Sequence, residues 1–338
     1  MRQVVITRHG PPEVLEVQEA ATPEPAAGEV RISVRAAGVN FADVLARLGL
    51  YPDAPSPPVV VGYEVAGIVD ATGPGTPRFH PGDRVLALTR FRGYATQVIT
   101  PVDFVFPLPE RLSDAEGAAL PVNYLTALIA LYRMANISPG ETVLIHGAGG
   151  GVGIAATQLA RLRRANIIGT ASAAKHDALR SFGVTHAIDY RTADVAREVR
   201  RLTNDRGVDV VLDPIGGRSF ATSYRLLAPL GRMVIYGVSA LAGGERRSWW
   251  RAARTIMQMP TFKPLALLNQ NRGVFGLNLG HLWNERAQLG GAMQVLLQEV
   301  AAGRLDPVVA KTFPLDRAAD AHRFMQSRAN IGKVVLTV

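Results

Sequence analysis

Glycines gather between residues 146 and 153, where the chain reads His-Gly-Ala-Gly-Gly-Gly-Val-Gly. A β-prone run, 142–145, precedes them, and an apolar stretch with helical spacing, 154–160, follows. In a strand–turn–helix unit, such glycines let the backbone approach a diphosphate, whose charge then faces the free N–H groups of the helix start. The pattern predicts a dinucleotide site. The alternative is a tight turn in an α/β layer that binds nothing.

The composition is that of an ordinary folded protein with a basic surplus. A chain of 338 residues is long enough for two domains with separate cores. The absence of cysteine excludes disulfides, thiolate metal sites and cysteine nucleophiles. The net charge is +9, but the excess is spread along the chain. This favours a solvated surface with one phosphate-binding pocket, and we expect no nucleic-acid partner.

No targeting or membrane-spanning segment is expected. The first residues read as a strand without a signal-peptide pattern. Two long uncharged stretches, 117–132 and 142–160, are too short or too rich in glycine for a transmembrane helix. We therefore expect a cytoplasmic protein.

The elements that would position the glycine run change character along the chain. Up to about residue 121, short β-prone runs broken by Gly and Pro predict a compact barrel-like domain. These runs are 3–7, 29–37, 65–71, 84–88 and 94–100, with a helical turn at 40–48.

From 122 to 279 strands and helices alternate, which predicts an α/β domain with a doubly wound parallel sheet. The expected strands are 142–146, 166–171, 187–190, 208–213, 233–237 and 273–276, with helices such as 175–182, 193–203 and 219–227. The residues after 279 should belong to the first domain, because the six strands of the parallel sheet are already complete without them. They read as a helix at 283–302, a strand at 308–313, a helix at 316–327 and a strand at 333–338.

Seven short motifs occur in an order that resembles the medium-chain dehydrogenase/reductase superfamily. They lie at 38–43, 49–52, 62–67, 81–85, 122–127, 148–153 and 330–333. The closest similarity is to its zinc-free quinone oxidoreductase branch, and 269–279 is similar to the vesicle-membrane-protein-like reductases. The resemblance covers essentially the whole chain. It implies a GroES-like, mostly-β catalytic domain (1–121 and 280–338) and a Rossmann dinucleotide-binding domain (122–279).

The zinc enzymes of this superfamily bind their metal through cysteines and a His-Glu pair. The matching places here hold Asn40, Tyr63-Glu64 and Asn123. One carboxylate cannot hold a tetrahedral zinc, so we predict no metal. Glu64 should be structural, holding a loop or a buried hydrogen bond. The scattered histidines should be ordinary surface or strand-end residues.

The coenzyme should be NADPH. The second strand of the α/β domain ends without the acidic residue that an NAD site usually carries, and Lys175 follows. In the family the residues that match Ser172, Lys175 and Tyr190 surround the extra ribose phosphate. The alternatives are a solvated lysine and a packed aromatic. The full set that the resemblance implies for coenzyme binding is Asn40, Asn123, Thr126, Ala148, Gly150, Gly151, Val152, Gly153, Ser172, Lys175, Tyr190, Gly237, Asn330 and Lys333.

Hydride transfer to a conjugated carbonyl builds negative charge on its oxygen, which hydrogen-bond donors must stabilise where no zinc is present. Tyr51 is the best phenol for this role, and Asn40 can orient the nicotinamide or the substrate. The alternatives are a loop aromatic for Tyr51 and a turn residue for Asn40. Leu45 stands where several quinone reductases carry another tyrosine, which leaves solvent as a proton source.

These features predict an NADPH-dependent, zinc-independent reductase of a quinone or an α,β-unsaturated carbonyl. One alternative is an enoyl reductase of activated thioesters. The other is a membrane-associated adaptor that binds NADPH with little turnover. The resemblance also implies a homodimer, paired through 275–279.

Residues 240–270 do not fit the strand–helix alternation. They combine Trp249, Trp250, Ile256, Met257 and Met259 with Arg246, Arg247, Arg251 and Arg254. Such a segment suits a lid, a partner surface or a membrane surface. The alternative is a packed helical insertion.

Overall fold

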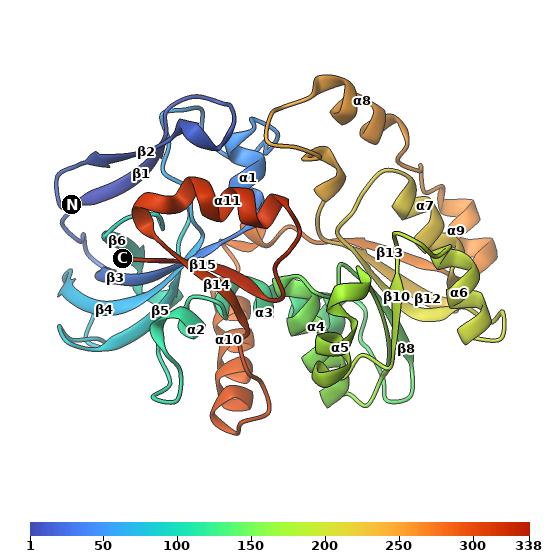
Figure 1. Ribbon diagram of the computed structural model, residues 1–338. Helices are drawn as coiled ribbons and strands as arrows, with labels where there is room; N and C mark the ends of the chain where they lie inside the picture. Colours follow the sequence, from blue (N-terminus) through green and yellow to red (C-terminus); the bar gives the residue numbers. More distant parts are fainter. The chain divides into compact units, whose positions relative to one another are not determined.

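The computed structural model describes all 338 residues, which form two compact units. Unit 1 consists of Met1–Leu125, Ala242–Arg247 and Gly280–Val338, and unit 2 consists of Thr126–Leu241 and Ser248–Leu279. In Figure 1, unit 1 is coloured mainly blue to teal and red, and unit 2 mainly green to orange. The first boundary falls inside a helix, and the short piece Ala242–Arg247 interrupts unit 2 in sequence.

Unit 1 is built on a seven-stranded sheet with the order β14-β15-β3-β4-β5-β7, in which β6 also pairs with β3. A separate antiparallel pair, β1 and β2, completes its strands. The bounds are β1 (Arg2–Ile6), β2 (Leu15–Glu19), β3 (Glu29–Val39), β4 (Glu64–Thr72), β5 (Arg84–Leu88), β6 (Gln97–Pro101), β7 (Val105–Pro107), β14 (Val309–Pro314) and β15 (Lys333–Thr337).

Alternation along β3 explains how the core of unit 1 forms. Val30, Ile32 and Val34 are buried while the residues between them are half-buried, as expected of a strand with one face on a core. The helices of this unit are α1 (Phe41–Arg47), α2 (Asp114–Gly117), α10 (Arg286–Ala301) and α11 (Ala318–Gln326), and α3 (Pro121–Leu128) crosses the boundary. The residues after 279 therefore belong to unit 1, since β15 pairs with β3.

Unit 2 has the predicted doubly wound topology. Its sheet is parallel throughout, with the order β10-β9-β8-β11-β12-β13. The strands are β8 (Thr142–His146), β9 (Asn166–Ala171), β10 (His186–Asp189), β11 (Val208–Asp213), β12 (Leu227–Ile235) and β13 (Gly273–Gly276). Every residue of β11 is buried, as expected of a strand covered on both faces.

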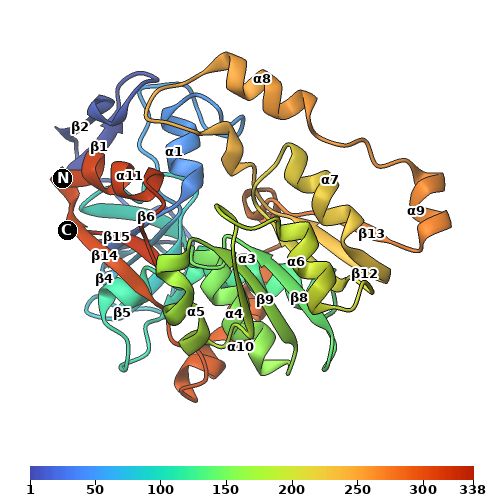
Figure 2. The ribbon, with the colours of Figure 1, turned by 45° about the vertical axis from the view of Figure 1, so that its right-hand side comes forward.

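Four helices connect these strands: α4 (Gly151–Leu162), α5 (His176–Phe182), α6 (Val195–Leu202) and α7 (Arg218–Arg225). The strand order reverses between β8 and β11, so right-handed crossovers place α4 and α5 on one face and α6 and α7 on the other. Val199 of α6 and Phe220 of α7 share one core cluster, and Figure 2 shows these two helices near each other. The point of reversal, where ligands bind in such sheets, lies directly after β8.

Residues 240–270 fold mainly as two short helices, α8 (Trp249–Met257) and α9 (Pro264–Gln270). Helix α8 buries Ala252 and Thr255, as a packed insertion would, but it leaves Trp249, Trp250, Ile256 and Met257 exposed. None of the helices in the structure combines the length and apolar character that crossing a bilayer requires.

Some predicted elements are shifted. The strand expected at 94–100 begins only at Gln97, because the backbone of Tyr94 is hydrogen-bonded to Val61 and Val4 instead. The strand expected at 233–237 begins at Leu227. Strands β2 and β7 were not anticipated, since β2 is largely exposed and β7 has only three residues.

Candidate functional site

The glycine run of unit 2 turns directly from β8 into α4. Gly150 is the N-cap residue of α4, and no side chain caps the first turn of this 12-residue helix. Gly147 has φ +64°, and a Cβ on Gly153 would lie 2.4 Å from the Gly147 carbonyl oxygen. The loop can therefore form only with glycine at these places, and its amides at the helix start have no competing side-chain acceptor. A diphosphate fits these donors.

Lys175 lies beside this loop. A Cβ built on Gly149 would come within 2.8 Å of Lys175 Cδ, so the aliphatic part of the lysine packs against the glycine. Its backbone N–H donates to the Ser172 carbonyl oxygen at 3.0 Å, in the turn that follows β9. Tyr190 follows β10 directly and is 40% exposed. The structure thus brings Lys175 and Ser172 to the carboxyl edge of the sheet, beside the glycines.

A buried chain of hydrogen bonds begins at Gly147 and ends at Asp213. The Asp213 carboxylate only accepts, so the Ser223 hydroxyl donates to it at 2.7 Å. Ser223 Oγ must then accept from His146 Nε2 at 3.0 Å. His146 Nδ1 accepts from the Thr170 hydroxyl at 3.1 Å, and Thr170 Oγ1 accepts from the Gly147 N–H at 3.3 Å. Burial lowers the pKa of His146, so the imidazole is neutral with its proton on Nε2.

Unit 1 holds a buried ionic cluster around Glu64. The Lys333 ammonium forms an ion pair with Glu64 Oε1 and donates to Asn40 Oδ1 at 2.7 Å and Asn123 Oδ1 at 3.5 Å. Asn40 Nδ2 donates to Glu64 Oε1 at 3.0 Å, and the Val122 N–H donates to Glu64 Oε2 at 2.7 Å. The side chains of Glu64 and Lys333 are 0% and 3% exposed. An ammonium therefore lies among the residues that match zinc-ligand places, and Glu64 has the structural role that we expected.

This cluster accounts for three residues that were expected at the coenzyme. Asn40, Asn123 and Lys333 lie together, although they come from three separate parts of unit 1. Direct coenzyme binding by Lys333 stays a prediction, because its ammonium contacts Glu64 and Asn40 instead.

A second buried network begins one turn along α1. Asp43 Oδ2 accepts from the Asn40 N–H at 2.7 Å and from the Tyr94 hydroxyl at 2.9 Å. The Tyr94 oxygen lies 3.2 Å from His322 Nε2, and Arg47 Nε donates to His322 Nδ1 at 3.3 Å. Burial raises the pKa of Asp43 to about 7 and lowers that of His322 well below its usual value. The expectation of a surface or strand-end histidine is wrong for His322, which is fully buried on α11.

An aromatic cluster of unit 1 contains Tyr51, the expected catalytic phenol. The Tyr51 ring packs edge-on against Tyr63, with 6.3 Å between ring centroids, and Tyr63 lies 5.2 Å from Phe91. The Tyr63 hydroxyl is buried and has no hydrogen-bond partner. In the sequence, Tyr63 stands out only because it occupies a zinc-ligand place of the zinc enzymes. No pattern in the sequence shows that a hydroxyl will be buried unpaired.

Three further residues predicted at the coenzyme, Thr126, Gly237 and Asn330, lie outside these clusters. Thr126 is buried in α3, at the first residue of unit 2. A Cβ on Gly237 would lie 3.3 Å from the Pro214 carbonyl oxygen, which explains why that position requires a small residue. Asn330 Nδ2 donates to the Gly332 carbonyl oxygen at 2.9 Å. The two expected catalytic side chains belong to different clusters of unit 1, Tyr51 to the aromatic cluster and Asn40 to the ionic one.

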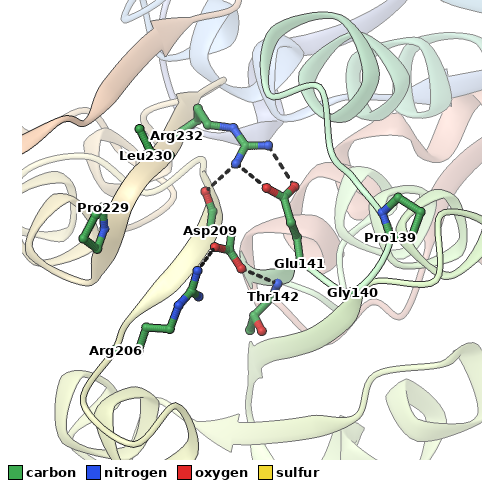
Figure 3. A pocket seen from close by; sticks show the side chains of 9 residues that line it. All are labelled: Pro139, Gly140, Glu141, Thr142, Arg206, Asp209, Pro229, Leu230 and Arg232. Carbon is green, nitrogen blue, oxygen red and sulfur yellow. Dashed lines mark hydrogen bonds and ion pairs between the residues drawn. The ribbon is translucent and has the colours of Figure 1, made fainter.

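A hollow at the opposite end of the unit 2 sheet is shown in Figure 3. Its charged side chains already have partners. Arg232 binds both oxygens of Glu141 at 2.7 and 2.9 Å, and Arg206 donates to Asp209 at 2.7 Å. Asp209 also accepts from the Thr142 N–H at 2.8 Å, which ties the starts of β8 and β11. We interpret this hollow as a structural clamp, because ligands of such sheets bind at the carboxyl ends of the strands.

Two protein-family models match this chain, and together they cover parts of both units. Residues 26–110 match the alcohol dehydrogenase GroES-like domain, and residues 182–336 match a zinc-binding dehydrogenase domain. The human synaptic vesicle membrane protein VAT-1 homolog is 41% identical over 339 residues, which cover 99% of this chain and 86% of that protein.

Solved structures show the same similarity over the whole length. Escherichia coli quinone oxidoreductase in complex with NADPH superposes with a TM-score of 0.88 at 31% identity, covering 100% of both chains. CurK enoyl reductase gives a TM-score of 0.87 at 32% identity and covers 99% of this chain and 98% of its own. The resemblance deduced from the motifs is confirmed. The chain belongs to the medium-chain dehydrogenase/reductase superfamily of oxidoreductases, in the branch that holds the quinone oxidoreductases and the VAT-1 homologues.

Proposed function

We propose that this protein is an NADPH-dependent, zinc-independent reductase of quinones or α,β-unsaturated carbonyls. The observation that carries the proposal is the uncapped, glycine-lined start of α4 with Lys175 packed against Gly149. Backbone amides suit a diphosphate, and an ammonium beside them suits a further phosphate on the ribose. The quinone oxidoreductase of similar fold is named as an NADPH complex, which supports the same coenzyme here.

Bound NADPH would supply a hydride, and the protein's own residues would stabilise the charge that appears on the carbonyl oxygen. Tyr51 is the proposed phenol donor. Asn40 is the proposed amide donor, because its nitrogen carries two hydrogens and only one is used by Glu64. Lys333 donates to the oxygen of the same amide, and hydrogen bonds in such a chain polarise one another. The buried ammonium would therefore make the remaining Asn40 N–H a better donor.

The decisive measurement is NADPH oxidation by purified protein with a panel of quinones, enones and enoyl thioesters. We expect turnover with quinones or enones, followed as loss of the nicotinamide absorbance. The enoyl reductase alternative, which the CurK similarity supports, predicts a preference for thioesters. Failure of every acceptor to oxidise NADPH, despite tight binding, would reject the reductase function.

The Tyr51→Phe variant tests the proposed phenol. Loss of one oxyanion donor lowers kcat by about 10²–10³. The dissociation constant of NADPH should change less than about twofold, since a donor used only in the transition state adds little to coenzyme binding. Unchanged turnover would assign Tyr51 to packing against Tyr63 alone.

A second candidate function, attachment to an anionic membrane surface, is favoured by helix α8. Its apolar side chains recur at positions i, i+1, i+4, i+7 and i+8 on a face that is exposed, with Trp250 at 89% and Met257 at 85%. Arg254 and Arg251 lie on one side of this face, and residues 246–284 contain no Asp or Glu. Exposed Trp beside Arg is typical of helices that lie in the headgroup layer. The expected cytoplasmic location stays a prediction, and the VAT-1 relatives are named vesicle membrane proteins.

Vesicle co-sedimentation tests this surface. We expect binding to phosphatidylserine-containing vesicles but not to pure phosphatidylcholine, and a blue shift of tryptophan fluorescence on binding. The Arg251→Glu/Arg254→Glu variant should lose most of the binding, since each cation near an anionic surface contributes about 1 kcal/mol. Arg197→Glu/Arg200→Glu on α6 is the matched control, because it reverses two exposed charges on another helix of unit 2. An equal loss of vesicle binding in both variants would show that only the net charge of the protein matters, and not helix α8.

We also propose a homodimer that pairs through β13. This strand lies at the edge of its sheet, bonded only to β12, and Phe275 on it is 38% exposed. Analytical ultracentrifugation should show a dimer that Val274→Pro dissociates, because proline removes a ladder N–H. A monomeric wild-type protein would contradict this pairing.

A further inference from the structure

Two buried side-chain polar atoms in the whole chain lack a hydrogen-bond partner, the hydroxyls of Tyr63 and Tyr224. Folded proteins rarely bury a hydroxyl unpaired, and such a group is explained by strain, by a catalytic role or by a partner that binds later. Tyr224 lies on α7 of unit 2, between Phe262 and Arg272. Tyr63 lies in unit 1, in the cluster that contains Tyr51.

The backbone around Tyr63 is held firmly on both sides. The Gly62 N–H donates to Asp43 at 3.1 Å, and Gly62 has φ +103°. The Tyr63 carbonyl oxygen accepts from the Thr89 N–H at 2.9 Å. The next residue, Glu64, belongs to the buried ionic cluster. The backbone of Tyr63 is therefore fixed between two buried polar clusters, and its ring packs among Tyr51 and Phe91.

Burial raises the pKa of Tyr63 strongly, and the carboxylate of Asp43 adds to the shift. The phenol is therefore protonated at any physiological pH and can act as a hydrogen-bond donor. It is not suited to release its proton as a general acid.

We propose that the Tyr63 hydroxyl donates a hydrogen bond to a carbonyl oxygen of the substrate, and that the rings of Tyr51, Tyr63 and Phe91 select a flat ring carbonyl, such as a quinone, over an extended thioester. The inference rests on the proposed reductase function and names the substrate class of that site. Aromatic side chains gain most from flat aromatic partners, by stacked or edge-to-face contact. A carbonyl oxygen would give the orphaned hydroxyl its missing acceptor.

The Tyr63→Phe variant tests the donor with two probes, naphthoquinone and crotonyl-CoA. With naphthoquinone we expect kcat to fall at least about tenfold, with NADPH affinity unchanged. The melting temperature should stay the same or rise, because the variant removes a buried unpaired hydroxyl. A purely structural hydroxyl would instead lower the melting temperature and leave kcat unchanged. Tyr224→Phe is the matched control, since it removes the other unpaired phenol and should leave turnover at the wild-type value.

Equilibrium binding separates this inference from the proposed function. The affinity of naphthoquinone for the NADP⁺-loaded protein, measured by calorimetry, should weaken in Tyr63→Phe and not in Tyr224→Phe. If wild-type protein oxidises no NADPH but shows this difference, the reductase function fails and the role of Tyr63 stands. Equal affinity and equal turnover of Tyr63→Phe and wild type would overturn it. So would a wild-type protein that binds no naphthoquinone or that turns over crotonyl-CoA faster.

Discussion

In unit 1 the polar cluster beneath the proposed substrate residues is ionic, whereas in unit 2 the cluster beneath the glycine loop is mostly neutral. Glu64 and Lys333 face each other with almost no exposed surface. His146, Thr170 and Ser223 instead pass hydrogen bonds along hydroxyls and a neutral ring, and only Asp213 carries charge. A phosphate is held by backbone amides, so its loop needs a precise shape. A carbonyl oxygen that gains charge needs side chains with an electrostatic bias.

Each unit also buries one histidine, and donor counting gives both the same tautomer. Tyr94 gives its hydrogen to Asp43, so His322 Nε2 donates to the Tyr94 oxygen just as His146 Nε2 donates to Ser223. The two rings differ at Nδ1. His322 faces the guanidinium of Arg47, and His146 faces the hydroxyl of Thr170.

The largest expected effect is that of Lys333→Met, which removes the cation of the buried ion pair in unit 1. The change leaves the Glu64 carboxylate buried without its cation, and breaking such a pair costs about 3–5 kcal/mol of unfolding free energy. Urea unfolding followed through Trp283, which stacks on Phe104 in unit 1 at 3.9 Å, measures the loss. Adding Glu64→Gln should recover part of it.

Lys311→Met is the control for that experiment. Lys311 is an exposed lysine on β14, the strand paired with β15, so its loss should change stability little. Similar losses in the two lysine variants would show that the buried ion pair contributes nothing of its own.

Lys175→Ala would sharpen the comparison by removing the charge that we assign to coenzyme choice in unit 2. Hydrogen bonds to charged groups contribute about 1.5–3 kcal/mol, so NADPH affinity should fall roughly 10- to 100-fold while NADH affinity barely changes. Fluorescence titration with both coenzymes gives the ratio, and Lys175→Arg should keep most of the preference. Equal losses for the two coenzymes would remove the argument for NADPH.

The most gradual expected effect is a pair of opposite pH slopes. The pKa of Asp43 is about 7 in the folded protein and 3.8 when unperturbed. The folded state therefore holds this proton more tightly, and the stability that Asp43 contributes falls as pH rises from about 4 to 7, by roughly 1 kcal/mol per pH unit. The pKa of His146 is lowered from 6.5, so its contribution falls as pH drops below 6.5.

Single variants separate the two slopes. Asp43→Asn should flatten the decline above pH 4, and His146→Gln should flatten the acid limb. Urea unfolding between pH 4 and 8, compared with wild type, gives both changes. Parallel curves for wild type and Asp43→Asn would show that Asp43 is ionised across the range.

The comparison also shows what the sequence could predict. The bounds of β8, β9, β11 and β13 agree with the predicted strands to the residue, because each is a short apolar run between turn residues. The glycine loop was equally readable, since its function depends on local backbone shape. The Glu64–Lys333 pair was not, because it joins β4 to β15 through tertiary packing. For the same reason the expectation for His322 is wrong, and the burial of the Tyr63 hydroxyl could not be predicted. Burial and partners of a side chain come from other elements, and periodicity around the residue does not report them.

The place of Lys333 at the last strand has a consequence for synthesis on the ribosome. Unit 2 is fully made once residue 279 emerges, but unit 1 lacks its closing strand until β15 appears. Until then Glu64 has no counter-charge and β3 has an unpaired edge beside Val39, which pairs with Val334. We therefore expect nascent chains to fold unit 2 first, while unit 1 completes its sheet only after β15 has emerged.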